Sequence, residues 1–122
     1  MTNVTSFLVT GDWRTVIDDT PADPDPDPDI INPTGHVRFI PTGKQPFLAG
    51  GVAYTIGATT GLVADGQLRD FQGREGVHLA ARIDGETIDW LAIVTLHAQG
   101  ATRVYERSFI LASDFHLTGD QP

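Results

Sequence analysis

Apolar residues alternate with polar ones in short runs along most of this chain, and Gly, Pro, Asp or Asn bounds each run. Residues 36–40 and 77–83 show the alternation most clearly, and Asp84-Gly85 closes the second of these runs. A period of two residues is that of a strand with one buried and one solvated face, and Asp-Gly is a favoured turn pair. The pattern predicts strands joined by tight turns.

Further strands are predicted at 4–10, 51–57, 90–98 and 102–111, with a shorter one around Trp13, Val16 and Ile17. Residues 113–117 are predicted to be either a short strand or a capped turn. Residues 90–98 are apolar on both faces, a pattern that a central strand shares with a buried helix. The turn at 99–101 and the strand pattern after it favour a β-hairpin there. About six to eight strands in a single domain, residues 1–122, suit a sandwich or a barrel, and we expect an all-β fold, a small β-sandwich.

An acidic, proline-rich segment interrupts this pattern between residues 18 and 33. Each Pro fixes φ and biases the preceding residue toward extended backbone, while like charges along the segment repel one another. We therefore expect 18–33 to be a long, exposed, polyproline-like loop. Its repeated Asp residues resemble a calcium-binding loop, but Pro28 stands where an EF-hand requires Gly, and Thr34 stands where it requires the bidentate Glu. We predict no metal site in this loop.

Most of the net charge lies in the same segment. The formal net charge is −8, and six of the sixteen acids lie there without any Lys or Arg: Asp18, Asp19, Asp23, Asp25, Asp27 and Asp29. Outside it ten acids face eight bases, which leaves −2 for the rest of the chain. Because no cluster of Lys or Arg is available to neutralise phosphates, we expect no nucleic-acid partner.

Neither cysteine chemistry nor a membrane span is expected. The chain has no Cys, which excludes disulfides, thiolate metal sites and cysteine nucleophiles. Its first residues show neither a basic nor a long apolar region of a secretory signal. The longest apolar stretch, 90–98, is far shorter than the roughly 20 residues that a spanning helix needs. We expect no membrane partner.

The residues that enzymes use do not fall into any catalytic pattern. His36, His78, His97 and His116 lie on separate segments without zinc-site spacing, and we predict that they are strand-surface or hydrogen-bonded residues. Ser108 and Ser113 are not part of a Gly-x-Ser-x-Gly elbow, and Gly43-Lys44 and residues 57–61 lack the full phosphate-loop pattern and predict turns. Glu75, Glu86 and Glu106 could act as glycosidase carboxylates, but a chain of this size offers little wall for a saccharide cleft. We predict no catalytic residue, no cofactor and no metal site.

Four aromatic residues leave two alternatives open. Trp13, Tyr54, Trp90 and Tyr105 lie in apolar runs and are predicted to pack in the core. If they were exposed together on one face, they would instead suit stacking on sugar rings.

The order of short motifs resembles a recurrent phage module. An opening Val-Thr-Gly strand is followed by Gly-His-Val-Arg-Phe-Ile-Pro-Thr at 35–42, by Leu-Val-Ala-Asp-Gly-Gln-Leu at 62–68, and by a strand that contains Tyr105. This arrangement resembles the β-sandwich modules of minor tail and tail-tip proteins of long-tailed actinobacterial phages, with "G-x-V-x-F-x-P-T" and "A-D-G-x-L" motifs. The acidic segment before Gly35 is longer than in that pattern, and 73–89 lacks an Asp-Pro-rich loop that many such modules carry.

The resemblance implies a non-enzymatic structural protein of a phage virion, a minor tail, baseplate or tail-tip component assembled in the host cytoplasm. Its partners would be other virion structural proteins and further copies of itself. The alternation leaves open which register of 90–98 faces outward, and we take Trp90, Ala92, Val94 and Leu96 as the assembly face. Two alternatives remain: a bacterial surface spacer or carbohydrate-binding β-sandwich, and a phage capsid decoration protein.

Overall fold

The computed structural model describes residues 4–17, 29–43 and 46–119, which form thirteen strands and no helix. Six strands have six residues or more: β1 (Val4–Thr10), β4 (Thr34–Pro41), β7 (Thr59–Ala64), β9 (Val77–Ile83), β11 (Asp89–Ala98) and β12 (Ala101–Ile110). Seven strands have two or three residues: β2 (Thr15–Ile17), β3 (Asp29–Ile31), β5 (Phe47–Ala49), β6 (Val52–Tyr54), β8 (Gln67–Arg69), β10 (Glu86–Thr87) and β13 (Phe115–His116). The all-β prediction is confirmed, although the described strands outnumber the expected six to eight.

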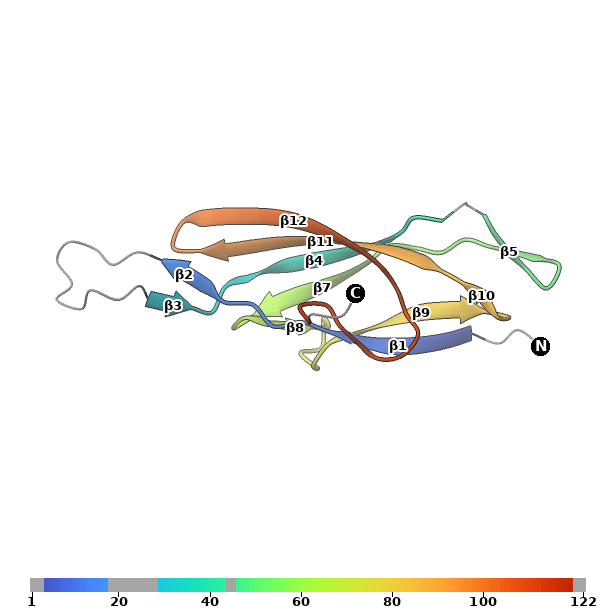
Figure 1. Cartoon of the computed structure of the whole chain (residues 1–122), viewed down its shortest axis with the longest axis horizontal. Helices are drawn as coiled ribbons and strands as arrows, with labels where there is room; N and C mark the ends of the chain where they lie inside the picture. Colours follow the sequence, from blue (N-terminus) through green and yellow to red (C-terminus); the bar gives the residue numbers. More distant parts are fainter. Residues whose placement is uncertain (1–3, 18–28, 44–45, 120–122) are drawn as a thin grey trace.

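Two sheets pack face to face as the layers of a β-sandwich (Figure 1). Sheet A has the strand order β10-β9-β1-β13, and sheet B has the order β12-β11-β4-β7-β8. The strands pair antiparallel except for β1 with β13. Two small hairpins, β2–β3 and β5–β6, extend from opposite ends of the sandwich (Figure 1).

The hairpin of β11 and β12 is the longest pairing in the molecule. Its register runs without a shift through ten residue pairs, from Asp89 opposite Ile110 to Ala98 opposite Ala101. Gln99 and Gly100 form the turn, and both have positive φ angles, as a two-residue turn that matches strand twist requires. The β-hairpin prediction for 90–98 and 102–111 is therefore confirmed, and the helical alternative is excluded.

The core lies between the two sheets and consists of the inward residues of the alternating runs. Sheet B contributes Val37, Phe39, Val63, Leu68, Trp90, Ala92 and Val94, and sheet A contributes Val9, Val77, Leu79, Ala81 and Ile83. The indole Nε1 of Trp90 crosses the layers and donates a 2.8 Å hydrogen bond to the carbonyl of Ala80. Burial of apolar surface and this polar link both hold the sheets together.

Glycine permits the closest backbone approaches in sheet B. Gly35 lies in β4 opposite Leu96 of β11, with a φ of 154°. A Cβ atom at this position would lie 1.9 Å from the carbonyl oxygen of Thr95, closer than any packing allows. The pairing of β4 with β11 thus explains why the 35–42 motif begins with Gly.

The structure corrects the predicted end of the acidic loop. Residues 18–28 lie outside the described residues, but Asp29–Ile31 forms β3 and pairs with β2. Pro33 is fully buried, and its carbonyl accepts a 2.9 Å hydrogen bond from the amide of Gly66. The prediction of an exposed loop that extends to Pro33 is therefore wrong for this last part, because the alternating prolines end at Pro28 and the β-branched residues after it pair as a strand.

Residues 47–64 differ from the prediction as well. The strand expected at 51–57 is reduced to β6, which pairs only with β5. Residues 59–64 were not predicted as a strand, because glycines at both ends of 57–61 indicated a turn. Gly61 instead lies inside β7, where a Cβ atom would approach the side chains of Val77 and Leu68 to 2.7 and 2.8 Å. It is required there by close packing of the two sheets.

Candidate interaction surface

The residues expected to form an assembly face lie inside the domain. Trp90, Ala92 and Val94 are 2%, 0% and 0% exposed, and Leu96 is partly buried against the same core. Sheet A covers this register of β11, so the prediction that Trp90, Ala92, Val94 and Leu96 form an assembly face is wrong. The alternation was correct, but only the position of the second sheet could decide which register faces inward.

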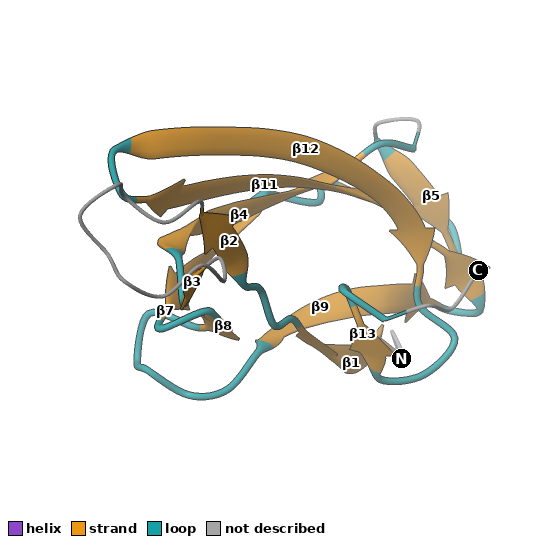
Figure 2. Ribbon diagram, turned by 60° about the vertical axis from the view of Figure 1, so that its left-hand side comes forward, coloured by secondary structure: helices purple, strands orange, loops and turns teal. Residues whose placement is uncertain are grey.

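The opposite register of β11 forms part of an outward surface. Leu91, Ile93 and Thr95 are partly exposed, and strand pairing places them beside the outward residues of β12 and β4. We call the apolar positions on this side of sheet B the outer face: Ile40, Leu62, Leu91, Ile93, Val104 and Ile110. Among these, Leu62, Val104 and Ile110 are 37%, 61% and 56% exposed. No described strand lies over the outer face in either view (Figures 1 and 2).

Charged residues stand beside the centre of the outer face. Ile93 lies between Arg38 of β4 on one side and Glu106 of β12 on the other. Both charged residues are exposed. An apolar centre bordered by solvated charges is the usual composition of a protein–protein contact.

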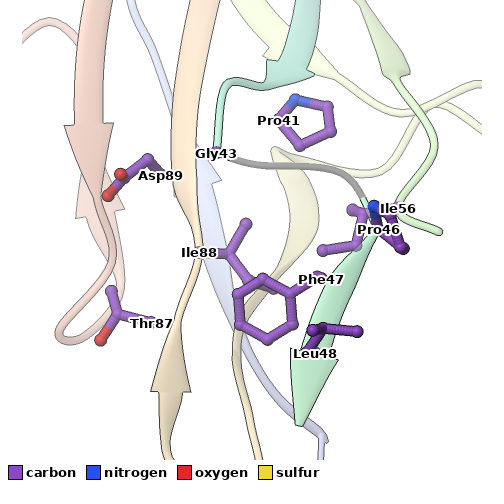
Figure 3. Close-up of a pocket in the computed structure, with 9 residues that line it drawn as sticks. All are labelled: Pro41, Gly43, Pro46, Phe47, Leu48, Ile56, Thr87, Ile88 and Asp89. Atoms are coloured by element: carbon purple, nitrogen blue, oxygen red, sulfur yellow. The ribbon is translucent and has the colours of Figure 1, made fainter. Parts of the chain in front are cut away.

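An apolar pocket of about 370 Å³ lies beside the β5–β6 hairpin (Figure 3). Its apolar lining includes Phe47, Leu48, Ile56 and Ile88 (Figure 3). Among the described residues that line it, only Thr87 and Asp89 have side chains with hydrogen-bonding groups, so these residues supply no general acid–base pair. Sequence patterns did not reveal it, because its wall comes from three separate segments.

The four histidines are surface residues of four different strands, as predicted. His97 Nδ1 lies 2.9 Å from the hydroxyl of Thr102, and His116 bonds to the hydroxyls of Thr10 and Thr118. Within 4–17, 29–43 and 46–119, no three His, Asp or Glu side chains are grouped closely enough to hold a metal ion. The three glutamates considered as glycosidase carboxylates also lie apart in the fold, Glu75 before β9, Glu86 on β10 and Glu106 on β12.

The four aromatic candidates do not form a common exposed face. Trp13 and Trp90 are buried, and Tyr54 is partly buried against the core, in agreement with the core-packing prediction. That prediction is wrong for Tyr105, which is 40% exposed on β12. Its hydroxyl accepts a 2.6 Å hydrogen bond from Trp13 Nε1, so Tyr105 covers the edge of the core.

Asp70 organises the loop between β8 and β9. Its Oδ1 accepts hydrogen bonds of 2.9 Å from the amides of Gln72 and Arg74, and its Oδ2 pairs with the Arg74 guanidinium at 2.8 Å. Desolvation raises the pKa of Asp70, but the bonds from Arg74 and Gln72 outweigh it, so the pKa lies below the ordinary value of 3.8. A lowered pKa means that the ionised form stabilises the folded loop above that value, and that this stabilisation is lost as the pH falls through the lowered pKa.

Replacing Asp70 with Ala should open this loop without unfolding the sandwich. The amides of Gln72 and Arg74 lose their acceptor, so their hydrogen exchange should accelerate by roughly tenfold or less. Asp70→Asn is the matched control, because its amide oxygen still accepts from both N–H groups. Unchanged exchange in Asp70→Ala would show that the backbone alone holds the loop.

The described part of the chain contains no helix, and so none long and apolar enough to cross a membrane. Comparison with protein-family models, with curated proteins and with solved structures finds no match for this chain.

Proposed function

We propose that this chain is a non-enzymatic structural protein of a phage virion, a minor tail, baseplate or tail-tip component that acts by assembly. The observation that carries the proposal is the outer face of sheet B. On this face the partly exposed Leu91 and Ile93 of β11 lie beside β12, which carries the exposed Val104 and Ile110. The other side of sheet B packs against sheet A. Partly exposed apolar side chains that stand among polar and charged ones, on a sheet face that no described strand covers, suit a surface that another protein covers.

The resemblance to phage tail modules supports the architecture in which this face is presented. In the 35–42 motif, Gly35 allows β4 to approach β11, and Val37 and Phe39 are core residues. In the 62–68 motif, Asp65 and Gly66 have positive φ angles and form the turn between β7 and β8. The motif residues therefore build the sandwich, and the outer face supplies the contact through which it would bind other virion proteins.

Two other functions compete with this proposal. A sugar-binding module has weaker support, because Trp13 and Trp90 are buried and Tyr105 is bonded to Trp13. A surface spacer and a capsid decoration protein both use the same kind of fold. Counting the copies of the chain in purified particles distinguishes these functions. A tail component occurs in a small number of copies set by the symmetry of the tail, and a decoration protein occurs in the far larger number set by the capsid lattice. A surface spacer is absent from the particles.

Ile93→Lys should prevent incorporation of the chain into particles. The substitution adds a charge between Arg38 and Glu106, and burying it against a partner carries a desolvation cost that it does not meet in the isolated domain, where water solvates it. Incorporation is measured by mass spectrometry of particles purified from a host that supplies only the variant chain. His78→Lys is the matched control, because His78 is an exposed residue on β9 of the other sheet. Normal incorporation of Ile93→Lys, or equal loss in both variants, would contradict a role for the outer face.

A further inference from the structure

Sheets A and B have four edge strands, and one of them is longer than the others and less covered by neighbouring segments. β10 and β13, at the edges of sheet A, have two residues each. β8 has three, and its free side is bonded by neighbouring segments: the amide of Leu68 donates to Gly11, and the carbonyl of Leu68 accepts from Gly76. β12 has ten residues and, among the described strands, pairs only with β11. Short or covered edges are the usual protection against pairing with another chain, and β12 lacks it.

Of the other devices that block an exposed edge, the one that β12 carries is charged side chains, those of Arg103, Glu106 and Arg107. The strand contains no Pro, Gly or Lys, and its pairing with β11 has no bulge. Residues 101–106 are all exposed. Among the described residues, no backbone–backbone hydrogen bond joins β12 to any segment other than β11. The inward-facing Arg107 guanidinium is not directed at the edge, because it lies over the Phe115 ring and donates to the carbonyl of Leu117.

We propose that β12 pairs antiparallel with β12 of a second copy of this chain, so that the two B sheets join into one. This inference deepens the proposed function and rests on it, because joining the sheets makes the two outer faces continuous. Edge pairing between identical strands satisfies the free N–H and C=O groups of both copies and closes by a two-fold axis.

The charges of β12 select a single register for this pairing. A two-fold axis perpendicular to an antiparallel pair places one residue opposite its own copy. Four such registers pair seven or more residues of β12, with Val104, Tyr105, Glu106 or Arg107 on the axis. An axis at Glu106 or at Arg107 places that residue opposite the same residue of the other copy, so like charges meet on the axis. An axis at Tyr105 places Arg103 opposite Arg107 of the other copy. Only the axis at Val104 avoids a directly opposed like-charge pair.

The register centred on Val104 also buries the exposed side chains of the strand. Val104 faces Val104 of the second copy, and each Arg103 faces a Tyr105 ring, to which a guanidinium is attracted. Thr102 faces Glu106 across the pair, where its hydroxyl is a suitable donor. The chain thus presents a self-complementary edge, and a second copy is the partner that this edge fits.

Cysteine cross-linking tests the register, because the natural chain has no Cys. In the proposed dimer the two residues at position 104 have Cα atoms about 4.5–5.5 Å apart, within disulfide range. Val104→Cys should form covalent dimers with oxidised glutathione, measured on a non-reducing gel. Glu106→Cys is the matched control on the same strand and face: its two copies lie about 13 Å apart, so its cross-linking should be at least about tenfold slower. Equal cross-linking of both variants, or none in Val104→Cys, would overturn the proposal.

A second pair of variants separates edge pairing from contact through the outer face. Val104→Lys places two lysines opposite each other and should weaken dimerisation at least about tenfold in sedimentation equilibrium. Ile110→Lys, similarly exposed but beyond the paired residues 101–107, should dimerise normally. Equal weakening by both variants would contradict edge pairing. If Val104→Cys fails to cross-link while Ile93→Lys is lost from particles, edge pairing is rejected and the proposed function stands. If Val104→Cys cross-links while Ile93→Lys is incorporated normally, the proposed function alone is rejected.

Discussion

Ala92→Lys should unfold the domain, whereas Ile93→Lys should leave it folded. Ala92 has no exposed surface and points between the two sheets, so a lysine there adds volume to a filled core and places an unpaired charge in it. The two effects together should lower the free energy of unfolding by at least about 4 kcal/mol, a large part of the stability of a small domain. Ile93 lies on the outer face, where a lysine reaches water, and the change should stay within about 1 kcal/mol.

Urea denaturation followed by circular dichroism measures both variants. Ala92→Val is the control for added volume without charge, and it should be destabilised by about 1–3 kcal/mol. A stably folded Ala92→Lys protein would contradict the packing of sheet A against this register of β11. An unfolded Ile93→Lys protein would show that the outer face is part of the core, and it would also remove the basis of the assembly experiment.

Trp90→Ala should lower the free energy of unfolding by about 3–5 kcal/mol, the second large effect, because it empties one of the two tryptophan sites of the core. Trp90→Phe keeps most of the apolar volume but removes the donor to the Ala80 carbonyl, the hydrogen bond between the two layers. Leaving this part-buried carbonyl without its partner should cost about 1–3 kcal/mol. Thermal unfolding of the two variants separates the contribution of volume from that of the hydrogen bond.

Trp13→Phe is the matched control for this hydrogen bond. Trp13 is also buried, but its Nε1 donates to the hydroxyl of Tyr105, which is 40% exposed and can bond to water instead. Trp13→Phe should therefore lower the free energy of unfolding by less than Trp90→Phe does, about 0.5–1.5 kcal/mol. A larger loss in Trp13→Phe than in Trp90→Phe would show that the bond between the layers contributes little.

Local sequence patterns determined the strands that have strong alternation or a defined turn. Residues 77–83 alternate strictly because one side of β9 meets the core and the other meets water, so the sequence alone located this strand. Asp84-Gly85 and Gln99-Gly100 located two turns, because few residues tolerate their positive φ angles. The turn predicted at Gly61 is wrong for a different reason: Gly61 does not have a positive φ angle, and its missing side chain allows a close contact between the sheets.

The candidate surface depended on information that no local pattern contains. The sequence showed that 90–98 is apolar on both faces, and it therefore restricted the contact to one of two registers. Only the position of sheet A decided that Ala92 and Val94 are core and that Leu91 and Ile93 face outward. The exposed edge of β12 likewise follows from the order of strands in sheet B. Alternation records which residues share a face, whereas the side that becomes buried depends on contacts between segments far apart in the chain.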